Sequence, residues 1–126
     1  MTFALLCVLA AGIMPILTVG FAKYGDRSFD NSAPRQWLAR QDGFRARAAA
    51  AQDNGFEAFP LFAAAVIVAQ MQGAPQGLTD LLAGTWIALR LGYVALYLAD
   101  IPTARSAVWS IALFVAIAIF LLPAFA

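Results

Sequence analysis

An arginine, an asparagine and a glutamate stand together at the start of the longest apolar helix that the sequence predicts. Arg47 and Asn54 are seven residues apart, and Glu57 follows Asn54 by three. At about 100° per residue, a helix places these three side chains within about a quarter of its circumference. The spacing therefore predicts one shared polar face on this helix.

A second helix is expected to carry a stripe of polar and aromatic side chains. Four residues of the third apolar segment are spaced four, three and four apart, which is the pattern of a single helix face. They are Trp86, Arg90, Tyr93 and Tyr97. The two tyrosines lie toward the end of this segment. In the predicted bundle this places them near the same membrane level as Asn54 and Glu57.

The last apolar segment opens with Arg105 and Ser106, shortly after a turn in which Pro102 is expected to end one helix and Thr103 to cap the next. An arginine in the first turn of a helix lies at the positive end of the helix dipole. The arrangement becomes favourable when an anion, such as a carboxylate or a thiolate, occupies the helix N-terminus beside Arg105.

These charges allow two interpretations. In the first, Glu57 and Arg90 form a structural ion pair, and the tyrosines mark an aromatic belt at the membrane interface. In the second, the cluster binds an anion from outside the chain. One glutamate cannot neutralise Arg47, Arg90 and Arg105 together, so the excess of donors favours the second interpretation.

The elements that must position these residues are four long apolar segments. The chain has 126 residues, of which 63% are hydrophobic and 12% charged, a balance outside that of a soluble domain. Each segment supplies the roughly 20 residues of a membrane-spanning helix, and the alternation of a barrel is absent. We expect an all-α integral membrane four-helix bundle, formed by a single domain over residues 1–126, with helices at about 2–22, 44–72, 78–99 and 104–125 joined by loops.

Several classes of site and partner are excluded. The one cysteine, Cys7, lies inside the first apolar segment and histidine is absent, so the chain has no disulfide framework and no Cys/His metal site. The first segment lacks a basic leader and a cleavage signal, which predicts a retained helix and not a signal peptide. A net charge of +1 argues against nucleic acid as a partner.

The basic residues predict the orientation in the membrane. Six of the eight Lys and Arg residues lie between the first two apolar segments, and the connection at 72–77 has none. The positive-inside rule therefore places the 23–43 loop in the cytoplasm and both termini on the other side. A span of about 30 Å then puts Asn54 and Glu57 in the cytoplasmic third of the membrane.

Taken together, the motifs resemble the MAPEG family, the membrane-associated proteins in eicosanoid and glutathione metabolism. The segment "NGFEAFPLF" at 54–62 is similar to that family's Asn-x-x-Glu signature, and "RLGYVALY" at 90–97 and "ARS" at 104–106 follow in the family's order. The segment at 54–62 is most similar to the group of leukotriene C4 synthase and the microsomal glutathione transferases, in a bacterial-type form. Two positions depart from the family pattern: Ala50, where an arginine is common, and Trp109, where some members carry tyrosine.

The resemblance implies a homotrimer that holds glutathione, its co-substrate, between helices of adjacent subunits near the cytoplasmic face. It assigns Arg105 to the glutathione thiolate, and a guanidinium beside the sulfur lowers the thiol pKa and makes it a better nucleophile. The other positions that it assigns to glutathione are Arg47, Asn54, Glu57, Arg90, Tyr93, Tyr97 and Ser106.

The expected function is that of a membrane glutathione transferase or peroxidase-like enzyme. Its substrates would be lipophilic electrophiles that partition into the bilayer, so membrane lipid, glutathione and a lipophilic small molecule are the expected partners. The alternative is a non-catalytic lipid-binding or scaffold protein of the same fold. A small transporter is disfavoured, because no predicted helix is broken at the midplane and no inverted repeat is apparent.

Overall fold

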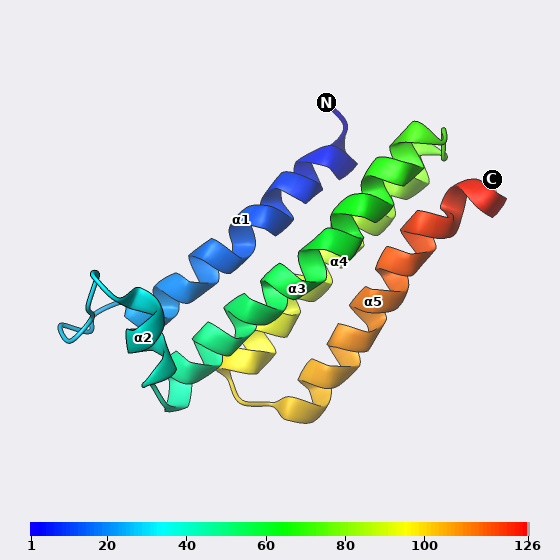
Figure 1. The fold of residues 1–126 in the computed structure, drawn as a ribbon. Helices are drawn as coiled ribbons and strands as arrows, with labels where there is room; N and C mark the ends of the chain where they lie inside the picture. The colour runs from blue at the N-terminus through cyan, green and yellow to red at the C-terminus, as the bar shows by residue number, and fades with distance from the viewer. Residues whose placement is uncertain (126) are drawn as a thin grey trace.

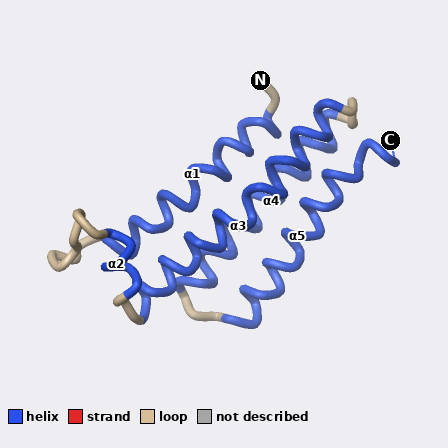
Figure 2. The backbone as a smooth tube through the Cα atoms, viewed as in Figure 1, coloured by secondary structure: helices blue, strands red, loops and turns tan. Residues whose placement is uncertain are grey.

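A computed structural model describes residues 1–125 and contains five helices within that range. Four are long: α1 (Phe3–Lys23), α3 (Gly43–Met71), α4 (Gln76–Leu98) and α5 (Pro102–Phe125). The fifth, α2 (Pro34–Ala39), is short. All four long helices are long and apolar enough to cross a membrane, and residues 1–125 contain no strand (Figures 1 and 2). The predicted all-α membrane bundle is therefore confirmed.

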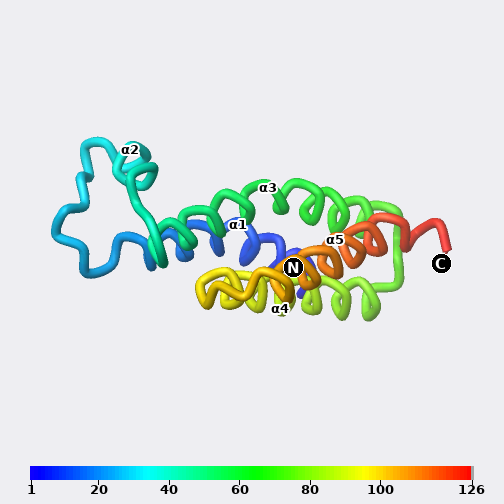
Figure 3. The backbone as a smooth tube through the Cα atoms, turned by 90° about the horizontal axis from the view of Figure 1, so that it is seen from below, coloured from blue at the N-terminus to red at the C-terminus, as the bar shows by residue number. Residues whose placement is uncertain are grey.

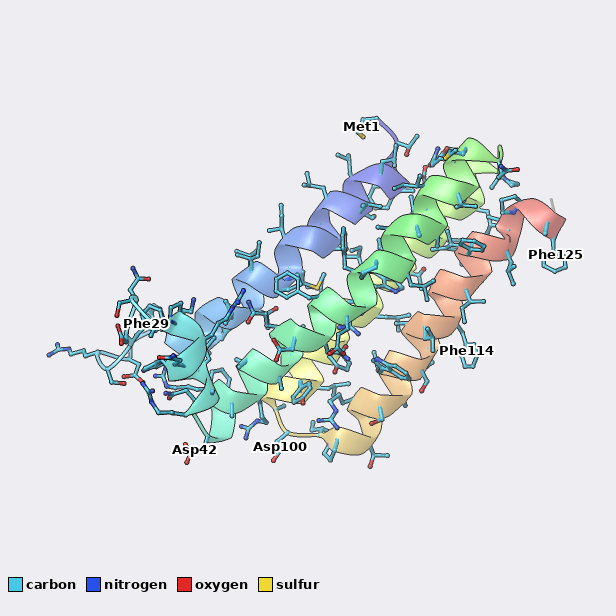
Figure 4. The ribbon with its side chains drawn as sticks, viewed as in Figure 1. Met1, Phe29, Asp42, Asp100, Phe114 and Phe125 are labelled. Carbon is cyan, nitrogen blue, oxygen red and sulfur yellow. The ribbon has the colours of Figure 1, made fainter. Side chains whose placement is uncertain are left out.

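The long helices run side by side, with their connections gathered at the two ends (Figure 2). Both chain ends lie at one end of the bundle, close to the α3–α4 turn (Figure 1). Asp42 and Asp100 mark the opposite end, where α3 begins and α4 ends (Figure 4). Helices α3 and α4 each pack against all three of the other long helices.

Small side chains allow the helices to approach closely. Buried alanines from all four long helices face the interior, as is common where membrane helices pack without a hydrophobic driving force between them: Ala4, Ala11, Ala65, Ala69, Ala83, Ala112 and Ala116. Phe62 of α3 stacks on Trp86 of α4 with ring centroids 3.8 Å apart. Large apolar side chains such as Phe114 point outward, where lipid would surround them (Figure 4).

A hydrogen-bonded cluster fixes the start of α1 at the end of the bundle that holds the termini. The Asp80 carboxylate accepts a hydrogen bond from the Ala4 backbone N–H at 2.9 Å and another from the Gln76 amide at 2.7 Å. The Thr2 hydroxyl donates to the Gln70 side chain at 3.1 Å. Asp80 places a carboxylate at the positive end of the α1 dipole, which is a stabilising position.

The segment predicted as a plain loop at 23–43 is more ordered than expected. It contains α2, whose Trp37 is buried, donates from its indole N–H to the Ser28 hydroxyl at 3.2 Å and packs edge-on against Phe29. The prediction was incomplete because a helix of six residues that buries a single tryptophan has too short a pattern to be recognised by periodicity. The loop and α2 extend beyond the end of the long helices (Figure 3).

Arg45 joins this loop to the bundle. Its guanidinium donates to the backbone carbonyls of Ala22 and Tyr24 and forms an ion pair with Asp26 at 3.6 Å, the one ion pair within residues 1–125. The hydrogen bond from the Ser28 hydroxyl is the main cause that lowers the pKa of the Asp26 carboxyl. Asp26 therefore keeps its charge beside Arg45 to a lower pH than an ordinary aspartate does.

The turn before α5 also differs from the prediction. Helix α5 begins at Pro102, so Thr103 lies inside the first turn and is not the residue that precedes the helix. Proline is favoured at the first helical position because its missing N–H has no partner there in any case. Arg105 still lies in the first turn of α5, as the sequence predicts, and Ser106 follows directly after that turn.

A close contact between α1 and α3 yields a stability prediction. A methyl group added at Gly55 would lie 2.8 Å from the Cγ atom of Pro15, whose ring cannot move aside freely. We expect Gly55→Ala to destabilise the bundle by about 1–3 kcal/mol, because the added atom overpacks the contact. Gly92→Ala on α4 is the matched control, since nothing lies within 4 Å of its added methyl group.

Thermal unfolding in mild detergent measures both variants. Gly92→Ala should be neutral or more stable by about 0.5–1 kcal/mol, because alanine is the better helix former. Equal melting temperatures for the two variants would contradict the close contact between α1 and α3.

Candidate functional site

Polar side chains from three helices line a cavity near the end of the bundle that carries the α4–α5 turn. The cavity has a volume of about 210 Å³. Its lining comes from α3, α4 and α5 and consists of Asn54, Tyr93, Tyr97, Arg105, Ser106 and Trp109. The structure thus brings together five of the residues that the sequence analysis selected, from segments far apart in the chain. We call this the polar cavity.

Arg90 lies in the interior of the bundle, about one turn of α4 before Tyr93 of the polar cavity. Only 2% of its surface is exposed, and its Nη2 donates to the Asn54 side-chain oxygen at 2.8 Å. Its guanidinium carbon lies 4.1 Å from the ring centroid of Tyr93 and 5.9 Å from that of Trp86. A neutral amide and two aromatic faces therefore hold the buried charge, through hydrogen bonding and cation–π contact.

Glu57 forms neither the ion pair with Arg90 of the first interpretation nor one with Arg47. Glu57 is exposed and forms no ion pair within residues 1–125. The side-chain oxygen of Asn54 accepts the hydrogen bond that Arg90 donates. Arg47 donates from its Nε to the Leu98 carbonyl at 3.3 Å, near the C-terminus of α4. Helix periodicity correctly grouped Asn54 with Glu57, but it could not decide which of the two lies level with Arg90.

Arg105 has a different environment from Arg90. Its guanidinium carbon lies 4.4 Å from the ring centroid of Tyr97, which in turn packs edge-on against Tyr93 at 5.7 Å. The side chain is half-buried, and its guanidinium makes no hydrogen bond or ion pair with any part of residues 1–125. Its five N–H donors are therefore free to bind an anion in the polar cavity.

A second, mostly apolar cavity adjoins the polar one. It has a volume of about 140 Å³. Its lining is Asn54, Glu57, Ala58, Leu61, Trp86, Arg90, Trp109, Ala112, Leu113 and Ala116, so Asn54 and Trp109 belong to both cavities. We call this the apolar cavity.

The sequence analysis singled out Trp109 only as a departure from a family pattern and did not find the apolar cavity. A signal was present, because Arg105, Trp109, Ala112 and Ala116 are spaced four, three and four residues apart and so share one face of α5. Ala50, the other departure, is half-buried and lines neither cavity. Residues 1–125 also contain no group of three His, Cys, Asp or Glu side chains that could hold a metal ion.

The partner of Arg90 can be tested by comparing two substitutions on one helix face. Asn54→Leu removes the acceptor and leaves a buried guanidinium unsatisfied, so we expect a loss of about 1.5–3 kcal/mol in the free energy of unfolding. Glu57→Gln should change it by no more than about 0.5 kcal/mol, because Glu57 is exposed and forms no ion pair. Thermal unfolding in detergent measures both, and a larger loss for Glu57→Gln than for Asn54→Leu would favour an ion pair of Glu57 with an arginine.

The fold and the site geometry can now be set beside known proteins. A model of the MAPEG family matches residues 3–125, which is nearly the whole chain. No curated protein and no solved structure matches it significantly. The match covers all four long helices and therefore every residue that lines the two cavities. The chain belongs to the MAPEG family, as a multi-pass integral membrane protein of this glutathione-related group.

Proposed function

We propose that the protein is a glutathione-dependent membrane enzyme, a transferase or peroxidase-like catalyst that acts on lipophilic electrophiles. The observation that carries the proposal is the guanidinium of Arg105. Its N–H donors have no hydrogen-bond acceptor within residues 1–125, and it lines a cavity together with two tyrosines and a serine. Membership of the MAPEG family supports glutathione as the ligand. The order of the motifs further supports placement beside leukotriene C4 synthase and the microsomal glutathione transferases, as a bacterial-type member.

Glutathione carries two carboxylates, one ammonium group and one thiol, and the polar cavity and the residues around it offer groups of matching chemistry. In our proposal Arg105 binds the sulfur. Arg47 and Arg90 supply positive charge for the carboxylates, although each already donates one hydrogen bond within the protein. The exposed carboxylate of Glu57 suits the ammonium group, because it has no competing ion pair within residues 1–125. Asn54, Tyr93, Tyr97 and Ser106 supply the remaining hydrogen bonds.

The chemical step follows from the placement of Arg105. The glutathione thiol gives its proton to water, and the guanidinium favours the resulting thiolate over the thiol. The sulfur then forms a bond to the electrophilic carbon, and the leaving group departs with its electron pair. A positive charge fixed beside the sulfur lowers the free energy needed to form the nucleophile and needs no reorganisation during the reaction.

We also propose that the site is shared between copies and opens toward the cytoplasm. Glu57 and Ser106 are exposed, and Trp109 is 41% exposed, on the outside of one chain. At membrane depth these groups would face lipid, which is unfavourable for polar side chains. A homotrimer would cover them, and the positive-inside bias of the 23–43 segment supports access from the cytosolic glutathione pool.

The thiolate proposal predicts a specific effect of Arg105. In Arg105→Ala we expect the pKa of bound glutathione to rise and turnover to fall by about 10² to 10³, as is typical when one preorganised electrostatic contact is lost. The affinity for glutathione should change less, because the other contacts remain. The ultraviolet absorbance of the thiolate, titrated against pH, measures the first effect directly.

Arg40→Ala is the matched control, because Arg40 is exposed in the segment that precedes α3 and lines neither cavity. It should leave titration and turnover unchanged. An identical pKa of bound glutathione in the wild type and in Arg105→Ala would remove Arg105 from the reaction. Absorbance that stays flat when glutathione is added to the wild type would instead favour a non-catalytic, lipid-binding member of the fold.

The shared site predicts the assembly. Native mass spectrometry in mild detergent should show three copies of the 13.4 kDa chain as the main species. A dominant monomer under conditions that keep bound lipid would leave the polar cavity without its second wall, and the shared-site proposal would then be abandoned.

A further inference from the structure

The stripe of aromatic and basic side chains on α4 reaches Arg105 of α5 through the ring of Tyr97. The proposed function uses only the charges and hydrogen-bonding atoms of these residues and leaves the rings without a role. We propose that the ring of Tyr97 is a positioning group, which holds the guanidinium of Arg105 in place for an anionic sulfur. The inference rests on the proposed function, because the sulfur would be that of glutathione.

Six side chains from three helices form a continuous series of ring and cation contacts. In order they are Phe62, Trp86, Arg90, Tyr93, Tyr97 and Arg105. The distances between successive members, measured between ring centroids or from a guanidinium carbon to a ring centroid, are 3.8, 5.9, 4.1, 5.7 and 4.4 Å. We call these residues the ring–cation series. It begins in the interior of the bundle and ends in the first turn of α5.

The inner part of the ring–cation series is fixed. Trp86, Arg90 and Tyr93 are buried, and Arg90 also donates a hydrogen bond to Asn54 at 2.8 Å. Buried side chains in a close-packed interior are held in low-energy rotamers. Tyr93 meets Tyr97 edge-on, with 79° between the ring planes, which is a preferred arrangement of two rings. Tyr97 therefore packs against a neighbour that cannot move freely.

The outer end of the series depends on Tyr97. The Arg105 guanidinium makes no hydrogen bond or ion pair within residues 1–125, and Tyr97 has the one ring that lies under it in this part of the chain. An arginine side chain has many rotamers, and fixing it costs entropy. The ring of Tyr97 is thus the group that limits the freedom of Arg105.

Contact with a ring fixes a guanidinium in a way that suits a binding site. A ring attracts the cation through its face, whereas the N–H donors of a guanidinium lie in its plane. A hydrogen bond to the protein would also fix Arg105, but it would occupy a donor. Contact with Tyr97 leaves every donor of Arg105 available to an anion in the polar cavity.

Stabilising a thiolate requires a charge that is already in place, because a charge that must first be ordered contributes less. If the ring of Tyr97 is removed, Arg105 keeps its charge and its donors but loses the contact that orders it. The inference therefore predicts a protein in which Arg105 is present and less effective. Loss of the Tyr97 hydroxyl alone should not have this effect.

Tyr97→Leu and Tyr97→Phe separate the ring from the hydroxyl. In Tyr97→Leu we expect the pKa of bound glutathione to rise, by less than in Arg105→Ala. Turnover at saturating glutathione should fall about three- to thirtyfold, which is the factor that corresponds to one cation–π contact. Tyr97→Phe keeps the ring, so the affinity for glutathione should fall through loss of one hydrogen bond while the thiol titrates as in the wild type.

A double variant tests whether Tyr97 acts through Arg105. In Arg105→Ala there is no guanidinium left to position, so adding Tyr97→Leu should change neither the pKa of bound glutathione nor turnover at saturation any further. Independent effects that add in the double variant would overturn the positioning role. The ultraviolet absorbance of the thiolate, titrated against pH, measures the pKa in all four proteins.

Phenylglyoxal, which reacts with free guanidinium groups, tests the contact without glutathione. Arg105 should be labelled about threefold faster or more in Tyr97→Leu than in the wild type, because the contact that restrains it is lost. Tyr97→Phe should be labelled like the wild type. Mass spectrometry of peptides measures the rate, with the exposed Arg40 as the reference within each sample.

Tyr24→Leu is the matched control, because Tyr24 is 85% exposed and lines neither cavity. It should change neither the titration of bound glutathione nor the labelling of Arg105. If Tyr97→Leu does not assemble, Tyr97→Met serves as a second variant, since methionine fills irregular space without a ring. The same rise in the pKa of bound glutathione is expected for it.

The outcomes separate the positioning role from the proposed function. If Arg105→Ala raises the pKa of bound glutathione and Tyr97→Leu does not, the positioning role is overturned and the proposed function stands. Equal titrations in Tyr97→Leu and Tyr97→Phe would also overturn it, because the ring would then have no effect of its own. If the wild type forms no glutathione thiolate, both the positioning role and the proposed function are overturned, and faster labelling of Arg105 would show a structural contact only.

Discussion

The guanidinium of Arg90 lies inside a bundle whose outer surface is apolar, so its hydrogen bonds must be made within the protein. Its Nη2 donates to Asn54 at 2.8 Å, and the ring of Tyr93 lies over its charge at 4.1 Å. This contact joins α3 to α4 at the level of both cavities. Because the acceptor is a neutral amide, the contact holds the arginine in place without neutralising it. The positive charges of Arg90 and Arg105 therefore remain unmatched at this end of the bundle, where an anionic ligand would be stabilised.

The two ends of the bundle use polar residues differently. Near the chain termini, the Oδ1 atom of Asp80 accepts hydrogen bonds from the Ala4 N–H and from the Gln76 side-chain amide, so this carboxylate is engaged within the protein. At the opposite end, the Arg105 guanidinium has no partner for its donors within residues 1–125. Hydrogen bonds made within the protein, such as those of Asp80, hold helices together. N–H donors that lie in a cavity without an acceptor indicate a ligand. The contrast is the physical reason to assign a binding role to one cluster and a structural role to the other.

Packing with small residues explains how cavities coexist with a close-packed bundle. Gly55 lets α3 approach Pro15 of α1, and buried alanines line the contacts among the other helices. Where the large rings of Phe62 and Trp86 stack, they hold α3 and α4 apart at a fixed spacing. Alanines that face Trp86 from α5 then leave space that no side chain fills, which is the apolar cavity. Rigid aromatic walls and small neighbours together define its size.

The sequence by itself determined the four membrane-length helices, because length and apolar composition are properties of each segment alone. It also determined the faces that carry Asn54 and Glu57 on α3 and Tyr93 and Tyr97 on α4, because helix periodicity fixes the angle of each side chain about its own axis. Only the tertiary structure decided that Asn54, and not Glu57, meets Arg90. That choice depends on the relative height and rotation of two helices, which the packing of both sets and neither sequence segment contains.

For the same reason, the tertiary structure alone showed that Trp109 lies between a polar and an apolar cavity. A cavity is the space left by several helices, so no periodicity within one of them can predict it. Helix α2 required tertiary information as well, because so short a helix is stabilised mainly by the burial of Trp37 and not by a pattern of its own. Local sequence thus set which residues were available to the site, and the packing of α3, α4 and α5 decided which of them meet.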